Sequence, residues 1–358
     1  MNAIHLNDLL LKCMDEGSSD LHLSVGIHPA MRKRGEITFL VDSEKMTQDS
    51  MAELLSSIVK KRHLTELANT KNCAFAYAIP GKGRFRVSVY QQRGTFCMTF
   101  RAGNFSAPTR ENLRMPDETE ALFEIKSGLI LVSGPKGSGT TSTCSYIIDV
   151  LRQTKKYHIV TIEDPIENLF SHDKSIISQM EVGLDVKDMH AGIEIALRDN
   201  ADVIYLSSMM DTDTIRLALE AARSGTIVIA TMDILGVEDV IRNTIDVFPA
   251  QSTNYIRTLL AQSLKCVISQ QLITDVNGDL IPLCEVMYGV RAVANLIREN
   301  KVVQIKQVLQ TGAKINMLSK DNHLKKLHKA GLISVDILKD FATDWKTLAL
   351  SMAKDNEE

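Results

Sequence analysis

The sequence predicts an α/β protein in which a small N-terminal α+β domain is followed by a larger domain with a parallel sheet and a helical C-terminal part. Three observations predict this class. The 358 residues exceed the roughly 100–200 residues of a usual single domain. Short alternating runs between residues 72 and 101 are typical of an antiparallel meander. Beyond residue 113, apolar runs alternate with helical ones, as in parallel sheets covered on both faces.

The composition excludes several classes of protein. Lys and Arg number 41 and Asp and Glu 44, for a net charge of −3, with 44% hydrophobic and 24% charged residues. These values argue against wholesale disorder and against a chain that coats nucleic acid. No apolar run is long enough to span a bilayer, and acids occupy the start where a secretion signal would be basic and then apolar. We therefore expect a cytoplasmic protein without nucleic-acid partners. The six cysteines form no CxxC pair, which favours buried thiols over disulfides or a zinc site.

The N-terminal domain is predicted to span residues 1–101. It opens with a helix over 4–16, continues with a short strand over 21–25 and an amphipathic stretch over 48–69, and ends in the meander. In RFRVSVY the period of two places Phe85, Val87 and Val89 on one face, while Arg84 and Arg86 share the other. We expect the apolar face to cover the core of this domain.

Residues 102–112 are rich in Pro, Gly, Ser and Asn without apolar periodicity, which indicates a linker. The second domain then runs over 113–358. Its predicted elements are strands at 128–134, 158–163, 202–208 and 226–231, helices at 141–152 and 212–223, and a helical remainder over 254–350.

The most informative segment is Gly134-Pro135-Lys136-Gly137-Ser138-Gly139-Thr140-Thr141, between a buried strand and a helix. It nearly matches GxxxxGK[ST], in which backbone N–H groups and a helix N-terminus hold nucleotide phosphates and the last hydroxyl binds Mg²⁺. Here Thr140 occupies the lysine position. Losing one charge-assisted bond to phosphate weakens binding by about 1.5–3 kcal/mol, or roughly 10- to 150-fold.

Two simpler interpretations of this segment stay open. In the first, the segment is only a glycine-rich turn between a strand and a helix. In the second, Lys136 is a solvated loop residue. The functional alternative is that Lys136 swings toward the phosphates and replaces the missing lysine, although its Cα lies four residues before the usual position.

The chain resembles, over nearly its whole length, the hexameric motor ATPases of type IV pili, specifically the PilT- and PilU-type retraction branch. The matching segments occur in the family's order and spacing. They are GSSDLHLS (17–24), HIVTIEDPIE (158–167), DVFPA (246–250), SLKCVISQQLI (263–273) and NLIRENKVVQI (295–305).

The resemblance implies a PAS-like N-terminal domain, a RecA-like P-loop core and six subunits in a ring that binds ATP or ADP with Mg²⁺. It implies that Glu163 is the general base, that Arg86 and Arg101 stabilise phosphate charge, and that Thr141 contacts Mg²⁺. A carboxylate beside a γ-phosphate can orient the attacking water. The plain alternatives are a strand-end acid paired with a neighbour for Glu163, and solvated sheet-edge charges for the two arginines.

The departures from the family lie where its chemistry occurs. After the strand DVIYL, the positions of Gly, Glu and Arg hold Ser207, Ser208 and Met210. After the next strand, the two histidine positions hold Thr226 and Asp233. A carboxylate at position 233 would repel phosphate, whereas imidazole can donate a hydrogen bond.

We therefore expect a pilus motor subunit with a degraded ATPase site that serves as an accessory or structural subunit. Its partners would be further copies in a homo-hexamer or an active paralogue in a mixed ring, together with the platform protein of the inner membrane, to which the chain would be peripheral. The alternative is a working retraction ATPase with a compensated phosphate loop. A third hypothesis is a decaying gene product whose fold has outlasted its function.

Overall fold

The computed structural model describes residues 3–33, 36–79, 82–102 and 107–355. The chain divides into two compact units, Met1–Ser106 with Glu167–Leu169, and Ala107–Ile166 with Phe170–Glu358. Residues 103–106 of the predicted linker lie outside the described residues. The end of that predicted linker forms a short helix, α4 (Arg110–Leu113), which a capping box on Thr109 begins.

The N-terminal unit contains one antiparallel sheet with the strand order β3-β2-β1-β6-β5-β4. Its elements are α1 (Ala3–Asp15), β1 (Asp20–Ser24), β2 (Ala30–Lys33), β3 (Glu36–Phe39), α2 (Gln48–Ile58), α3 (Lys61–Thr70), β4 (Asn72–Ile79), β5 (Gly83–Gln92) and β6 (Thr95–Ala102). The predicted meander is confirmed as β4, β5 and β6. Phe85, Val87 and Val89 are each at most 1% exposed, which confirms the face predicted for the core.

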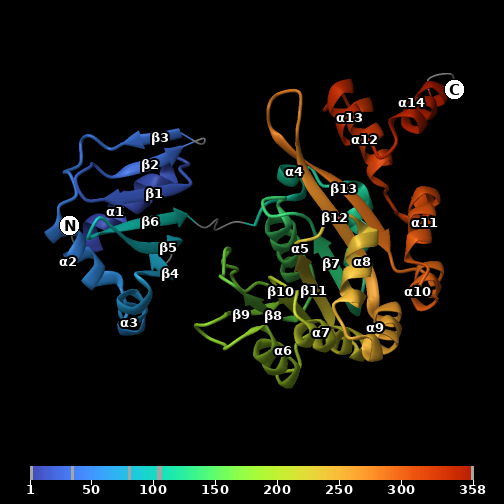
Figure 1. Ribbon diagram of the computed structural model, residues 1–358, viewed down its shortest axis with the longest axis horizontal. Coiled ribbons are helices and arrows are strands. Elements are labelled where there is room, and N and C mark those ends of the chain that lie inside the picture. Colours follow the sequence, from blue (N-terminus) through green and yellow to red (C-terminus); the bar gives the residue numbers. More distant parts are fainter. Residues whose placement is uncertain (1–2, 34–35, 80–81, 103–106, 356–358) are drawn as a thin grey trace. The chain divides into compact units, whose positions relative to one another are not determined.

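The C-terminal unit contains a seven-stranded sheet with the order β13-β12-β7-β11-β10-β8-β9, in which only the β12–β13 pair is antiparallel among the described strands (Figure 1). Its strands are β7 (Gly128–Ser133), β8 (His158–Glu163), β9 (Ile176–Glu181), β10 (Val203–Leu206), β11 (Ile227–Met232), β12 (Leu264–Thr274) and β13 (Leu280–Tyr288). Its helices are α4, η1 (Asp117–Glu124), α5 (Thr140–Thr154), α6 (Met189–Arg198), α7 (Thr212–Ser224), α8 (Val237–Asp246), α9 (Ala250–Ser263), α10 (Arg291–Arg298), η2 (Val302–Gln304), α11 (Ile305–Thr311), η3 (Gly312–Ile315), α12 (Lys320–Lys329), α13 (Val335–Phe341) and α14 (Trp345–Asp355).

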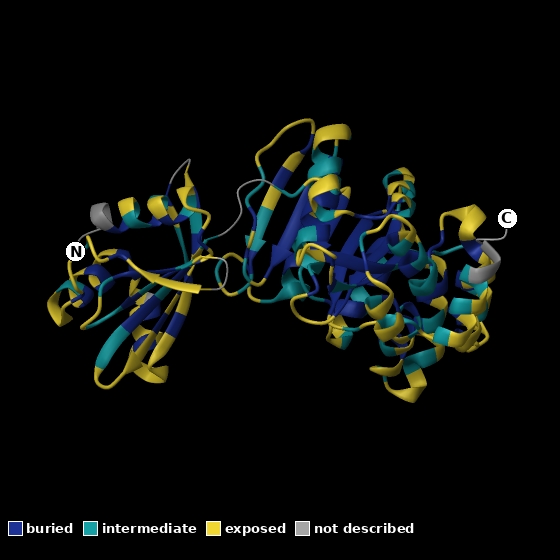
Figure 2. Cartoon of the chain, turned by 90° about the horizontal axis from the view of Figure 1, so that it is seen from above, coloured by how far each residue is buried: buried dark blue, intermediate teal, exposed yellow. Residues whose placement is uncertain are grey.

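Both faces of this sheet are covered, as the sequence predicts, and its central strands are buried (Figure 2). Alternate residues of β7 point to opposite faces. Leu129 and Leu131 pack in the core that helices α6 to α9 complete, whereas Ile130 and Val132 pack in the core that contains α5. The α/β class with a parallel sheet is therefore confirmed.

The prediction of a helical remainder over 254–350 is wrong for residues 264–288, which form the hairpin β12–β13. The hairpin turn contains Asn277 and Gly278, and Gly278 has a φ of +86°. Asn-Gly between two runs of β-branched and apolar residues is a strong hairpin signal, and it outweighs the helical pattern of the flanking segments. The rest of the remainder is helical, as predicted.

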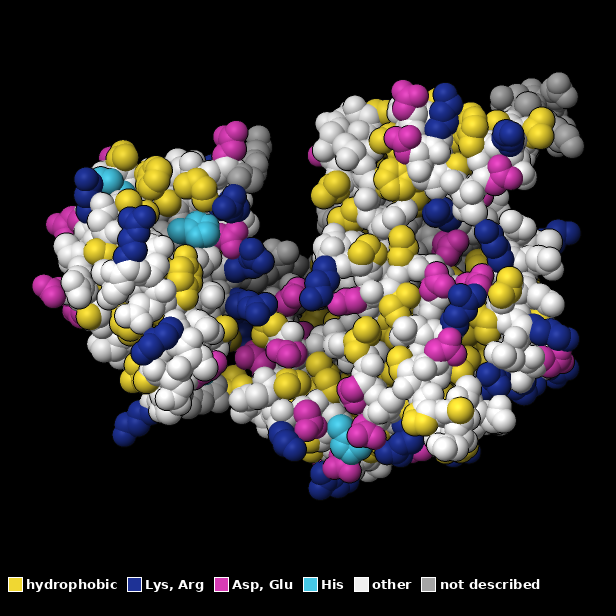
Figure 3. All heavy atoms as spheres, in the orientation of Figure 1, with side chains coloured by type: hydrophobic (Ala, Val, Ile, Leu, Met, Phe, Trp, Pro, Cys, Tyr) yellow, Lys and Arg dark blue, Asp and Glu magenta, His cyan; other side chains and the backbone are white. Residues whose placement is uncertain are grey.

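The surface of the molecule mixes charges of both signs, with acidic and basic side chains interspersed on the face shown in Figure 3. Within the described residues, no helix combines the length and the apolar character that crossing a lipid bilayer requires. All six cysteines are free and buried, which confirms the expected buried thiols.

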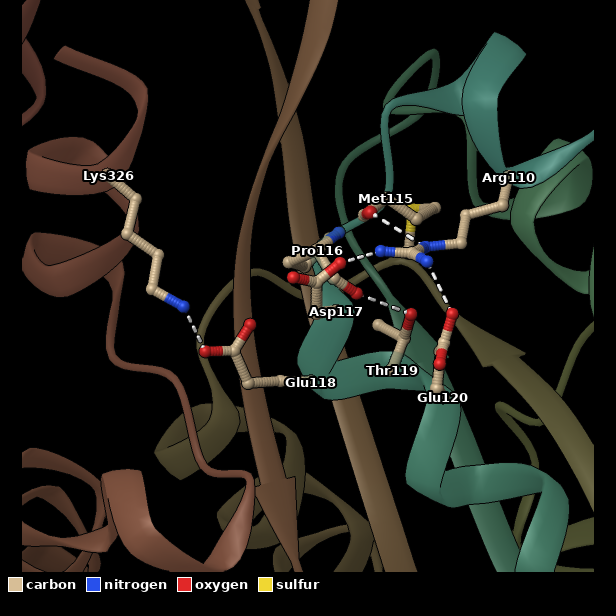
Figure 4. A network of polar contacts seen from close by, with 8 residues as sticks. All are labelled: Arg110, Met115, Pro116, Asp117, Glu118, Thr119, Glu120 and Lys326. Atoms are coloured by element: carbon tan, nitrogen blue, oxygen red, sulfur yellow. Dashed lines mark hydrogen bonds and ion pairs between the residues drawn. The ribbon is translucent and has the colours of Figure 1, made fainter. Parts of the chain in front are cut away.

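A polar network fixes the start of the C-terminal unit (Figure 4). Arg110 of α4 forms ion pairs with Asp117 and Glu120 of η1. Glu118, also in η1, pairs with Lys326 of α12, and its carbonyl accepts a 2.7 Å hydrogen bond from the Tyr288 hydroxyl. The segment that follows the predicted linker is thereby tied to β13 and to the C-terminal helices.

Candidate functional site

The glycine-rich segment forms a loop between the end of β7 at Ser133 and the start of α5 at Thr140. Gly137 and Gly139 have φ values of +84° and +83°, a region that residues with a Cβ rarely adopt. The N–H of Ser138 donates to the Pro135 carbonyl at 2.9 Å, which closes a turn inside the loop. A loop of this form turns successive backbone N–H groups inward, as in anion-binding nests.

Gly134 is required by close packing. A Cβ at this position would lie 2.1 Å from the Gln270 carbonyl oxygen of β12, a distance that no side chain tolerates. A Cβ at Gly137 would meet nothing within 4 Å, so this part of the loop is open. The loop is therefore closely packed against β12 at Gly134 and free of close neighbours at Gly137.

The first turn of α5 supplies the rest of a phosphate cradle. The first N–H groups of a helix lack intrahelical partners and carry the positive end of the helix dipole. Thr140 and Thr141 lie in this turn, and both are partly exposed. Such a helix N-terminus can hold an anionic group, and the Thr141 side chain lies in its first turn. The side chain at position 140 supplies no positive charge.

A cleft of about 660 Å³ lies at the carboxyl ends of the parallel strands, where α/β proteins bind ligands. It is lined by Lys136, Asp164, Val182, Asp188, Met189, His190, Ser207, Ser208, Asp211, Asp213, Thr214 and Asp233. The cleft joins the phosphate loop, through Lys136, to the ends of β8, β10 and β11.

Five aspartates and one lysine line this cleft. Two of the aspartates have basic neighbours, since Lys187 lies 3.7 Å from Asp188 and Arg216 lies 3.9 Å from Asp213. Asp188 and Asp211 cap helices α6 and α7, accepting 2.9 Å hydrogen bonds from the N–H groups of Ala191 and Thr214. Burial would raise the pKa of Asp211, but hydrogen bonds from Thr214 and nearby N–H groups outweigh it and hold the pKa below its usual value. Asp211 is therefore ionised at neutral pH. Among the described residues, no three His, Cys, Asp or Glu side chains converge as metal ligands.

Glu163, the predicted general base, ends β8 and is 3% exposed. Its Oε1 atom accepts hydrogen bonds from the Thr161 hydroxyl at 2.6 Å and from Gln179 Nε2 at 3.1 Å. The next residue, Asp164, lines the cleft, whereas Glu163 is not among the described residues that do so. Glu163 is therefore held by hydrogen bonds through Oε1, directly before a residue that lines the cleft.

The positions that depart from the family fall into two groups. Ser207, Ser208 and Asp233 line the cleft with Lys136, whereas Met210 is 44% exposed and does not line it. Thr226 precedes β11 and its carbonyl accepts a hydrogen bond from the Gly128 N–H. The expectation that Thr226 and Asp233 both follow the strand is therefore wrong: the length of β11 separates them, and only Asp233 lies at the cleft.

Arg86 and Arg101 lie directly opposite each other on β5 and β6, neither of which is an edge strand of the N-terminal sheet. Both residues are exposed, as the alternative of solvated charges expects. Asp20 of β1 is paired in register with Arg101, and Arg101 Nε donates to its carboxylate at 2.9 Å. Burial would raise the pKa of Asp20, but hydrogen bonds from Ser19 and Arg101 outweigh it and lower the pKa. The ionised Asp20 thus holds the exposed guanidinium of Arg101 in place.

Sequence reasoning missed several residues at the cleft. Asp188 and Asp211 precede helices, and an N-cap pattern could have located them. Gln270 interrupts the apolar strand β12 and contacts the phosphate loop, where its Nε2 donates to the Ser138 carbonyl at 2.8 Å. A polar residue in the middle of a buried strand indicates that its side chain has a hydrogen-bond partner. The sequence does not identify that partner, because Ser138 lies 132 positions away from Gln270.

Comparison with known proteins places these features in a family. The family model described as "Type II/IV secretion system protein" matches residues 3–330. A Pseudomonas aeruginosa protein described as "Type IV pilus retractation ATPase PilT" is 35% identical over 329 residues, which are 92% of this chain and 95% of the relative. A Neisseria gonorrhoeae "Twitching motility protein" is 33% identical and covers 86% of this chain and 82% of the relative.

One solved structure agrees with these relatives. The crystal structure of "the Pilus Retraction Motor PilT and Bound ADP" superposes with a TM-score of 0.88 at 35% identity, over 97% of this chain and 98% of that chain. The resemblance thus extends over both units of the fold.

Proposed function

Because the chain belongs to the type II/IV secretion system protein family, and within it to the PilT-like proteins of type IV pili, we propose that it is a motor-ring subunit with an impaired ATPase site. The subunit binds ATP or ADP weakly, with Mg²⁺, and hydrolyses ATP slowly or not at all. It works as an accessory or structural part of the twitching-motility machine.

The observation that carries this proposal is the charge of the cleft. Thr140 stands where a lysine would meet the phosphates, and five aspartates line the adjoining cleft against one lysine, Lys136. A triphosphate brought there meets like charge, which opposes both binding and the growth of negative charge during phosphoryl transfer. Loss of one preorganised group of this kind lowers a rate by about 10²–10³.

Weak nucleotide binding is retained because most groups of the cradle belong to the backbone. The glycine conformations and the free N-terminus of α5 support phosphate binding without any side chain. A solved relative of 35% identity holds ADP, as its title states. The bound nucleotide therefore stabilises the conformation of the subunit and is not a substrate that it hydrolyses efficiently.

In this role the subunit is mechanically passive. It occupies positions in a homo-hexamer or in a mixed ring with an active paralogue, on the cytoplasmic side of the inner membrane, and contacts the platform protein of the pilus. In the mixed ring, neighbouring paralogue subunits with intact sites drive its movement. Arg86 and Arg101 present positive charge on the N-terminal sheet for this assembly.

The test measures Mg²⁺-dependent phosphate release by the purified full-length chain and by Glu163→Ala. Equal and background release from both proteins is the expected result. Turnover that Glu163→Ala abolishes would instead establish the alternative, a working retraction ATPase in which Lys136 or another group replaces the missing charge.

A second arm restores the missing groups. Thr140→Lys combined with Ser208→Glu should raise phosphate release above background, because Ser208 lines the cleft and Thr140 begins the helix that follows the phosphate loop. A binding titration with ADP should show saturation below millimolar concentration. No ADP binding up to millimolar concentration would refute the nucleotide-binding part of the proposal.

A further inference from the structure

Gln270 is a buried amide that touches the phosphate loop at two points. Its side chain is 1% exposed in β12. Nε2 donates to the Ser138 carbonyl at 2.8 Å, and Oε1 accepts from the Thr143 hydroxyl at 2.8 Å. Ser138 and Thr143 are themselves at most 2% exposed. One side chain therefore binds the loop and the first turn of α5 together.

The backbone of Gln270 adds a third contact. Its carbonyl oxygen lies so close to Gly134 that a Cβ there would be 2.1 Å away. A Cβ at Gly139 would lie 3.4 Å from Gln270 Nε2. Residue 270 thus contacts the beginning, the middle and the exit of the loop. The loop is also bonded to β11, because the Gly134 N–H donates to the Met232 carbonyl at 3.1 Å.

The geometry of the peptide bond gives these contacts a consequence. In a trans peptide the C=O of one residue and the N–H of the next point in opposite directions. Because Gln270 holds the Ser138 carbonyl, the N–H of Gly139 is directed away from β12. We infer that Gln270 is a positioning residue, which holds the loop with the Gly139 N–H aimed at the site of the phosphate.

This inference rests on the proposed nucleotide binding and explains how binding survives without the lysine. Thr140 cannot draw phosphate in by charge, so affinity depends on N–H groups that are already oriented. Hydrogen bonds inside a buried site are costly to break, because the separated groups find no water. Gln270 thereby removes the ordering cost that a free loop would impose on the ligand.

The neighbouring residue is a matched control. Gln271 has the same side chain, points to the opposite face of β12, and lines a separate cavity with Ser269 and Glu285. Gln270→Met keeps the length of the side chain and removes its donor and acceptor. Gln271→Met makes the same change at the next position of β12, on the opposite face of the strand.

The experiment compares the full-length wild type, Gln270→Met and Gln271→Met. Hydrogen exchange of peptides covering residues 134–143 is measured without nucleotide. Affinity is measured with ADP and with inorganic pyrophosphate as a competitor, and thermal midpoints are recorded. Gln270→Met should exchange faster in this segment alone and bind ADP and pyrophosphate about tenfold more weakly, while Gln271→Met matches the wild type.

Each outcome decides the question. Unchanged loop exchange in Gln270→Met, or the same change in Gln271→Met, overturns the inference. Faster exchange spread over the whole C-terminal unit also overturns it, since that result marks a general loss of stability. If the wild type binds no ADP, the proposed function fails, and the exchange measured without nucleotide still tests whether Gln270 holds the loop.

Discussion

We propose that Thr140, which supplies no positive charge, limits how strongly the phosphate loop binds nucleotide. Replacing Thr140→Lys should tighten ADP binding by about 10- to 150-fold, since one charge-assisted bond to phosphate contributes about 1.5–3 kcal/mol. The change is made at the first position of α5, where the loop leads into the helix. Calorimetric titration with ADP and Mg²⁺ measures it.

Thr140→Met is the control for this change, because methionine has nearly the length of lysine and no charge. It should leave the affinity for ADP unchanged. Equal gains in Thr140→Lys and Thr140→Met would mean that side-chain contact, rather than charge, was missing from the loop.

For single residues, the sequence predicts features formed by neighbouring positions and misses contacts between positions far apart in the chain. The loop from Gly134 to Thr141 is recognisable because its residues are contiguous and follow a buried strand. The contact between Gln270 and Ser138 joins two segments that only the folded sheet brings together. The aspartates of the cleft come from separate loops for the same reason, so their summed charge is visible only in the structure.

Helix α6 packs against strand β8 through Gly192. A Cβ at this position would lie 2.7 Å from two side-chain carbons of Ile162, which is fully buried and cannot move away. Gly192→Ala should therefore lower the free energy of unfolding by up to about 2 kcal/mol, which is overpacking of about 1–3 kcal/mol less the roughly 1 kcal/mol of helix propensity that alanine gains. Urea unfolding measures the change.

The partner residue supplies the control. In the background Ile162→Ala, which removes the obstructing carbons, Gly192→Ala should cost nothing or stabilise the protein. A Gly192→Ala variant as stable as the wild type would show that α6 and β8 can separate without cost.

His323 of α12 links the C-terminal helices to β13 and makes stability depend on pH. It is 3% exposed, and its Nδ1 accepts a 2.9 Å hydrogen bond from the Cys284 N–H. Burial lowers the pKa of His323 from 6.5 to about 4. The negative charge of Glu118 raises this pKa, but its effect is smaller than that of burial. The unfolded chain therefore takes up a proton before the folded one does. Stability is full above pH 6.5 and falls by about 3 kcal/mol as the pH decreases toward 4.

Unfolding free energies measured from pH 7 to pH 4 test this dependence. His323→Asn retains an acceptor for the Cys284 N–H and does not titrate in this range. The difference between wild type and His323→Asn should shrink or reverse as the pH falls. A constant difference across the range would exclude His323 as the source.

Among the elements, the short apolar strands between helices are predicted, whereas strand β9, helices α6 and α8 and the hairpin β12–β13 are not. The strands β7, β8, β10 and β11 are short apolar runs between helices, and the structure confirms them. The hairpin β12–β13 is missed because helical segments flank it, although Asn277 and Gly278 mark its turn. The edge strand β3 is exposed along its whole length, so no apolar alternation reveals it.

At the scale of the whole molecule, we expect assembly into a ring. Mass photometry of the full-length chain should detect a particle of six times the monomer mass, or a mixed particle of that size when an active PilT-like paralogue is added. Nucleotide should favour assembly if ADP orders the subunit, by mass action. A chain that stays monomeric with nucleotide and with the paralogue would contradict the ring proposal.

The burial of all six thiols has a practical consequence for following such a ring in motion. Burial raises the pKa of Cys13 to about 11 and that of Cys266 to about 12, so their reactive thiolate forms are scarce at neutral pH. A cysteine introduced on the surface would therefore react with a maleimide fluorophore far ahead of the native ones. Energy transfer between dyes on neighbouring subunits would then measure changes in the distance between those subunits in a ring of otherwise unmodified protein.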